Sequence, residues 1–139
     1  MTKYLTTLCL ISGGILPILV DVNTSHLLNP DWDSHARVHE AWRLSTNFLV
    51  FSLGIFLLWS KNKEMLGGLL SLCIHFGFVL GAAFMPLYGG EPVGEGIPEP
   101  EILMLPLNVF FFGSMFLLQS AVLIVVFKKN NLSLSDELR

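Results

Sequence analysis

The sequence predicts an all-α integral membrane protein, a four-helix bundle with the N- and C-termini on the cytoplasmic side. Charged residues make up 14% of the 139 residues, against about a quarter in an average soluble domain. They are also unevenly spread, because four stretches contain no Asp, Glu, Lys or Arg: 4–20, 44–60, 65–90 and 102–127. This composition excludes a water-soluble globular domain and a disordered chain, and the net charge of −3 argues against nucleic-acid binding. The expected partner is the lipid bilayer.

Each stretch is long enough to cross a bilayer once its flanks are included, since a helix needs roughly 20 apolar residues to do so. We therefore predict a single domain, residues 1–139, with spans over about 4–21, 41–60, 65–87 and 102–127. Lys3 and the following apolar run resemble the start of a signal peptide. No small-x-small cleavage site precedes Asp21, so the first span is expected to be retained. The polar segment 128–139 is expected to be a mobile cytoplasmic tail.

The orientation follows from the basic residues. The side that holds the N-terminus, the 61–64 link and the tail carries six Lys and Arg against three acidic residues, a net charge of +3. The opposite side carries two Arg against eight acidic residues, a net charge of −6. Basic residues favour the cytoplasmic side during insertion. We therefore expect both termini to be cytoplasmic in the plasma membrane, which is the inner membrane in a Gram-negative cell.

Three prolines, Pro17, Pro86 and Pro106, lie within about five residues of the outer ends of their spans. A proline removes a backbone donor and loosens the preceding turn, which is tolerated at membrane depth where protein or water covers the freed carbonyl. One interpretation is a cleft open to the outside, and the other is that the prolines only mark helix ends. The Gly-, Pro- and Glu-rich loop 89–101 is expected to lie over this end as a solvated flap.

Inside the third and fourth spans, two further patterns predict contacts between helices. Gly77 and Gly81 are four residues apart, a spacing that lets two helix backbones approach closely. His75 and Gln119 fall at similar depth, so an interhelical hydrogen bond between them is expected.

Segment 21–43 concentrates the polar chemistry, with three of the four histidines and both outer arginines. Asp31, Asp33 or Ser34 can cap a helix that runs on into the second span, and on that helix His35 and His39 share a face. Three interpretations remain open for the histidines. A divalent metal could be bound by His26, His35 and His39. The histidines could instead pair with Asp31, Asp33 or Glu40 and fix the loop. Finally, His35 or His39 could act as a general base while Arg37 holds an anionic group.

The same segment resembles the signature of a family of small four-span membrane proteins of bacteria and fungi. The residues that carry the resemblance are Asp21-x-Asn23-x-Ser25-His26-x-x-Asn29-Pro30-x-Trp32-x-x-His35-Ala36-Arg37-x-His39. Asp33-Ser34 stands where members of that family often carry two prolines. The resemblance implies a four-helix fold and no particular activity. It marks as functional candidates Asp21, Asn23, His26, Asn29, Trp32, His35, Arg37 and His39.

These observations lead to two functional hypotheses. In the first, an outward-facing polar pocket binds a lipophilic or amphiphilic small molecule, with or without a metal. Its ligand-binding residues would be Asp21, Asn23, His26, Asn29, Trp32, Asn47 and Asn108. In the second, the protein is a non-catalytic subunit or scaffold of a membrane complex, and the 21–43 loop docks a partner.

Overall fold

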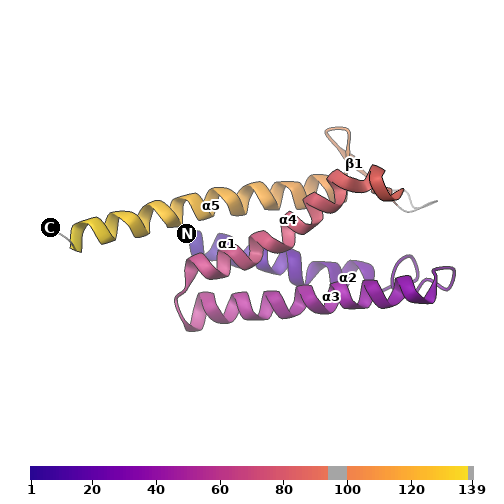
Figure 1. Cartoon of the computed structure of the whole chain (residues 1–139), viewed down its shortest axis with the longest axis horizontal. Coiled ribbons are helices and arrows are strands. Elements are labelled where there is room, and N and C mark those ends of the chain that lie inside the picture. Colours follow the sequence, from indigo (N-terminus) through magenta and orange to yellow (C-terminus); the bar gives the residue numbers. More distant parts are fainter. Residues whose placement is uncertain (94–99, 138–139) are drawn as a thin grey trace.

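A computed structural model describes residues 1–93 and 100–137 of the chain. Its helices and strands are α1 (Thr2–Gly14), α2 (Leu16–Asp21), α3 (Ser34–Ile55), the π-helical turn η1 (Phe56–Ser60), α4 (Glu64–Tyr88), β1 (Glu101–Ile102), β2 (Leu105–Pro106) and α5 (Leu107–Glu137). Within the described residues, four helical segments are long and apolar enough to cross a membrane: Thr2–Asp21, Ser34–Ser60, Glu64–Tyr88 and Leu107–Leu132. The predicted all-α, four-span fold is therefore confirmed (Figure 1).

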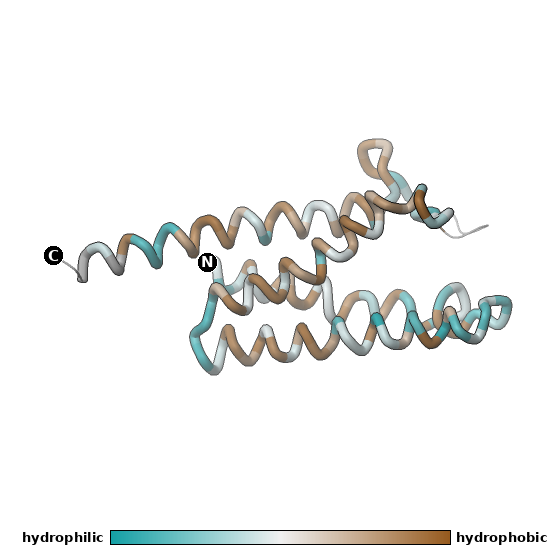
Figure 2. Tube along the Cα trace, viewed as in Figure 1, coloured by the Kyte–Doolittle hydropathy of each residue, from teal (hydrophilic) through white to brown (hydrophobic). Residues whose placement is uncertain are grey.

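Both ends of the chain lie at one end of the bundle, together with the link between η1 and α4 (Figure 1). We call this the terminal end, and the opposite end, which carries the connections 22–33 and 89–106, the loop end. Polar residues gather at the two ends and apolar residues along the helices between them (Figure 2). Apolar side chains point outward from the helices, and Leu49 and Leu117 are 66% and 67% exposed. Such a surface belongs in lipid rather than in water, so the chain is a multi-pass membrane protein.

The first span is broken into α1 and α2 at Ile15, where Pro17 enters the first turn of α2. Proline is tolerated there because the first backbone N–H groups of a helix have no partner within it. Two glycines precede the break and are closely packed. A Cβ atom on Gly14 would lie 2.2 Å from the Cβ of Phe51 on α3, and one on Gly13 would lie 2.8 Å from Ile74 on α4. The glycines therefore let α1 approach both neighbouring helices.

The second span begins earlier than position 41, because Asp33 caps the helix. Its carboxylate accepts a hydrogen bond of 2.8 Å from the backbone N–H of His35, which satisfies one of the free donors at the helix start. At the terminal end, the indole N–H of Trp59 donates to Thr7 at 3.0 Å. The ammonium of Lys3 lies 4.3 Å from the centre of the Trp59 ring. These contacts join the start of α1 to the end of η1.

The fourth span differs from its predicted limits at both ends. Its helix begins at Leu107 rather than at 102, because a proline disfavours helical backbone at the residue before it, and Pro106 keeps Leu105 extended. Residues Glu101–Ile102 and Leu105–Pro106 pair as a short antiparallel hairpin instead. At the other end, α5 continues to Glu137 and includes most of the predicted mobile tail, since no Gly or Pro follows Gly113. Residues 94–99 of the predicted flap and 138–139 of the tail lie outside the described residues.

The centre of the bundle is polar. The buried ring of His75 lies 3.1 Å from the hydroxyl of Ser12 and, through Nδ1, 2.8 Å from the carbonyl of Ser71. Gln119 is also fully buried, but its amide forms no hydrogen bond with the described residues. The expected bond between His75 and Gln119 is therefore wrong. The two ring nitrogens of His75 instead contact the hydroxyl of Ser12 on α1 and the carbonyl of Ser71, one turn back on α4.

Candidate functional site

A cavity of about 1040 Å³ lies at the loop end between α2, α3, α4 and α5. The α2–α3 pair and the α4–α5 pair separate toward this end (Figure 1). The apolar part of the wall consists of Leu16, Pro17, Val20, Ile74, Gly77, Phe78, Gly81, Ala82, Met85, Pro92, Leu107, Val109, Phe111 and Phe112. The polar and charged lining residues, which we call the polar mouth, are Asp21, His26, Glu40, Arg43, Asn47, Tyr88, Glu91 and Asn108. A smaller hollow of about 400 Å³ has no charged residue in its lining.

The cavity is deep as well as large. On α4 its lining extends from Tyr88 to Ile74, which are 14 positions apart. At a rise of 1.5 Å per residue this corresponds to about 21 Å along the helix axis. Small-molecule pockets are usually about 300–1,000 Å³ in volume. With about 1040 Å³, the cavity matches the upper limit of that range, and it is long enough to hold an extended apolar chain.

Gly77 and Gly81 line this cavity and do not pack against another helix. A Cβ atom on Gly77 would meet no atom within 4 Å, and one on Gly81 would meet only the Tyr88 hydroxyl at 4.0 Å. The prediction that this motif brings two helices together is therefore wrong. The glycines that do fill this role include Gly13, Gly14 and Gly68. On α4 the absence of side chains at Gly77 and Gly81 contributes directly to the volume of the cavity.

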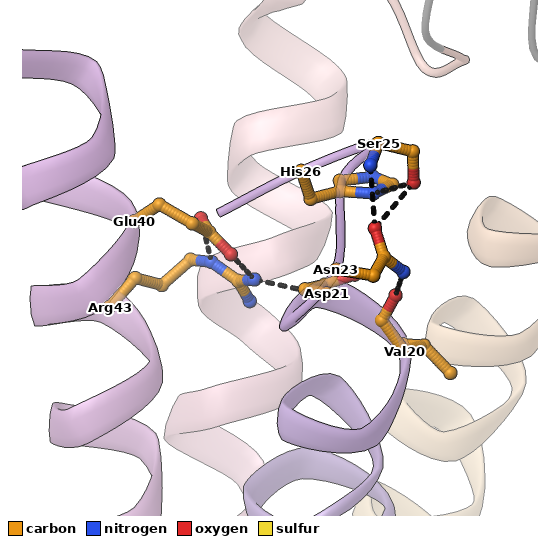
Figure 3. Close-up of polar contacts among 7 residues, drawn as sticks. All are labelled: Val20, Asp21, Asn23, Ser25, His26, Glu40 and Arg43. Atoms are coloured by element: carbon orange, nitrogen blue, oxygen red, sulfur yellow. Dashed lines mark hydrogen bonds and ion pairs between the residues drawn. The ribbon is translucent and has the colours of Figure 1, made fainter. Parts of the chain in front are cut away.

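An ion-pair cluster joins α2 to α3 in the polar mouth (Figure 3). The guanidinium of Arg43 lies 2.5 Å from the carboxylate of Asp21, and its Nε donates to Glu40 at 2.8 Å. A second contact joins Arg43 to Glu40 through Nη2. The Asp21 and Glu40 side chains are only 16% and 14% exposed, whereas that of Arg43 is 43% exposed. Two carboxylates share one guanidinium, so the cluster has a net charge of −1.

A chain of hydrogen bonds fixes the ring of His26 beside this cluster (Figure 3). The Asn23 amide nitrogen donates to the carbonyl of Val20 at 2.7 Å, which turns the amide oxygen toward Ser25. That oxygen is 2.7 Å from the Ser25 hydroxyl oxygen. Only the hydroxyl has a proton to place between two oxygens so close together. The nitrogen Nδ1 of His26, 2.9 Å from the same hydroxyl oxygen, must therefore be the donor, and in the neutral ring Nε2 is left as an acceptor.

The predicted ligand-binding residues divide into two groups. Asp21, His26, Asn47 and Asn108 line the cavity. Asn23 acts behind His26, Trp32 contacts the His26 ring edge to face at 6.0 Å, and Asn29 accepts the backbone N–H of Asp31. Asn23, Trp32 and Asn29 are not among the residues that line the cavity, so they shape the loop rather than touch its contents.

His35 and His39 lie on an exposed face of α3, outside the cavity. Their Nε2 atoms are 3.0 Å apart, and the ring of His39 stacks on Trp42. His26 is not with them, and the described residues contain no group of three His, Cys, Asp or Glu that could hold a metal ion. The predicted three-histidine metal site is therefore not formed. The helix α3 that begins after Asp33 carries His35 and His39 on its exposed face, whereas the contact with Ser25 holds His26 at the cavity. Arg37 also lies outside the cavity lining.

Sequence reasoning missed several members of the polar mouth, including Glu40, Arg43, Tyr88 and Glu91. The spacing of Glu40 and Arg43, three residues apart, is typical of an ion pair on a helix and could have identified the first two. Comparisons with protein-family models, with curated proteins and with solved structures find no match.

Proposed function

We propose that this membrane protein binds an amphiphilic small molecule with a long apolar chain, taken up from the extracytoplasmic side of the plasma membrane. The observation that carries the proposal is the cavity itself. Its deep part is lined mainly by aliphatic and aromatic side chains and by the glycines of α4, and its charged residues lie toward the loop end. An amphiphile has the same two-part chemistry, with an apolar chain and a polar head group.

The proposed orientation uses the charge asymmetry of the sequence. Lys3, Lys61 and Lys128 are among the six basic residues of the terminal end and its tail, against two arginines at the loop end. The positive-inside rule then assigns the loop end to the outside of the cell. The segment that resembles the four-span family supplies Asp21 and His26 to the polar mouth, which is consistent with a binding role for that segment.

The alternative proposal is that the protein docks a partner through the 21–43 loop. It is favoured by the exposed side chains of Val38 and Trp42, which are 62% and 66% exposed on α3. Trp is also enriched at membrane interfaces, so these exposed residues have a second explanation. Substitution of Trp42 and Val38 by Ser distinguishes the two functions, since it would abolish partner docking and leave an amphiphile in the cavity.

The test of cavity binding is mass spectrometry of small molecules that co-purify with the protein. Gly77→Leu and Gly81→Leu place a side chain in open space inside the cavity, so they are expected to fold normally and to lose the bound molecule. Gly113→Leu is the matched control, because Gly113 also has no atom within 4 Å of a built Cβ and does not line the cavity. Equal recovery of every molecule from all three variants would rule out binding in this cavity.

A further inference from the structure

The polar mouth carries an excess of negative charge. Three carboxylates, those of Asp21, Glu40 and Glu91, line it together with one guanidinium, that of Arg43. With His26 neutral, the net charge is −2. Charges in a partly dry cavity interact more strongly than charges in water, because the effective dielectric constant is lower. A ligand that brings positive charge would therefore be attracted, and one that brings negative charge would be repelled.

Several hydrogen-bond donors of the mouth are already engaged with protein oxygens. Arg43 directs Nε and Nη2 at Glu40 and Asp21. The Tyr88 hydroxyl donates to the carbonyl of Gly81 at 2.6 Å, and the side-chain amide of Asn108 donates to the carbonyl of Pro92 at 2.6 Å. A ligand carboxylate or phosphate would have to displace these contacts to use these donors.

Acceptors in the mouth, in contrast, retain unused capacity. A carboxylate has about four lone-pair sites, and Asp21 uses one of them toward Arg43 while Glu40 uses two. When the His26 ring is neutral, the hydrogen bonds through Ser25 to Asn23 place its proton on Nδ1, and Nε2 is then a further acceptor. The mouth is therefore suited to a head group that donates hydrogen bonds.

We infer that the preferred ligand is a single-chain amphiphile with a primary ammonium head group. The inference rests on the proposed function and adds the chemistry of the head group. The ammonium supplies three donors and one positive charge, which matches the carboxylates of Asp21 and Glu40 and the acceptor nitrogen of His26. The apolar chain occupies the depth from the mouth down to Ile74 and Phe112. This reverses the expectation that an arginine of the 21–43 segment, Arg37, holds an anionic group.

The inference is tested with three probes of equal chain length. The protein in phosphatidylcholine nanodiscs is equilibrated at neutral pH with hexadecylamine, hexadecanol and hexadecanoate together, and the bound molecules are counted by native mass spectrometry. Protein-free nanodiscs correct for partition into the lipid. We expect the amine to exceed the carboxylate by about tenfold or more, a free-energy difference of about 1.4 kcal/mol.

Charge-removing variants show whether the mouth is the cause of this preference. Glu91→Gln removes one carboxylate without touching the Arg43 ion pairs and should lower the amine-to-carboxylate ratio at least about threefold. Glu40→Gln should act in the same direction. Asp31→Asn is the matched control, because Asp31 is an exposed carboxylate of the 22–33 connection, also at the loop end, that does not line the cavity, and it should leave the ratio unchanged.

The outcomes separate this inference from the proposed function. Equal binding of the three probes, or a preference for the carboxylate, would overturn the ammonium assignment while cavity binding stands. An equal fall in the ratio for Asp31→Asn and Glu91→Gln would also overturn it, since the effect would then come from general surface charge. If no probe binds wild type above the level of Gly81→Leu, the proposed function itself fails.

Discussion

Replacement of Arg43 by Met tests the ion-pair cluster that joins α2 to α3. Methionine keeps much of the apolar stem of arginine and removes its charge. The variant leaves the carboxylates of Asp21 and Glu40 without their shared partner. These side chains are only 16% and 14% exposed. The structure therefore predicts a clear loss of stability, and the loss should be concentrated at the loop end.

The size of the loss follows from the burial of the three side chains. Removing one partner from a fully buried ion pair costs about 3–5 kcal/mol, whereas an exposed pair contributes about 0.2–1 kcal/mol. Arg43 is 43% exposed, so water screens part of each interaction. We therefore expect Arg43→Met to lower the free energy of unfolding by an intermediate amount, about 2 kcal/mol, through the lost contacts with both Asp21 and Glu40. Arg37→Met is the control and should cost less than about 0.5 kcal/mol.

A double-mutant cycle of Asp21→Asn and Arg43→Met measures the pair itself. Unfolding of the two single variants and the double variant is followed in the same lipid or detergent. Residues in direct contact show coupling energies of about 0.5–3 kcal/mol, and we expect about 1 kcal/mol here. If the two substitutions add without coupling, the contact between Arg43 and Asp21 does not stabilise the loop end, which would refute the role of this ion pair in joining α2 to α3.

Two further predictions concern the glycines of the bundle and the exposed histidines. Gly14→Ala forces a methyl group onto an α3 side chain and should lower the free energy of unfolding by about 1–3 kcal/mol, whereas Gly77→Ala enters open space and should be neutral or stabilising; equal effects on thermal unfolding would refute the division into packed and cavity glycines. His35 and His39 offer only two ligand atoms, so cupric ion should bind weakly and quench Trp42 fluorescence. The double substitution of His35 and His39 by Ala should abolish the quenching and leave the cavity-bound molecule in place. Loss of that molecule would show that these histidines contribute to its binding.

Much of the fold was accessible from the sequence, because a bilayer requires long uncharged helices. The four charge-free stretches correspond to the four spans, and Asp33 was among the predicted helix caps. The errors in the limits of the fourth span come from local backbone preferences that a hydropathy pattern does not reveal. Residues 102–106 are as apolar as the span after them, but Pro106 prevents the preceding residue from being helical. The segment after 127 is polar, but nothing in it stops a helix.

The site was less accessible, because it depends on which faces of the helices meet. Asp21 and His26 were singled out in the polar 21–43 segment, and Asn47 and Asn108 as polar groups within the spans, and the fold does bring all four to one cavity. The sequence could not separate His26 from the other two histidines, since their distance depends on how the loop folds back. Nor could it show that Arg43, at the edge of a span, is the centre of the polar mouth.

The glycines show why a motif in a membrane helix has no fixed meaning. On α4, Gly68 meets Leu123 of α5 within 2.7 Å of a built Cβ, whereas Gly77 meets no atom within 4 Å. The same absence of a side chain closes the bundle at Gly68 and opens it at Gly77. The difference arises on α1, where Gly13 and Gly14 pack the first span against its neighbours up to the break at Ile15. Beyond that break the two helix pairs separate. Gly77 and Gly81 therefore contact no neighbouring helix, and their missing side chains add to the cavity. A cavity with a closed base and a polar mouth is the consequence of that single change in packing.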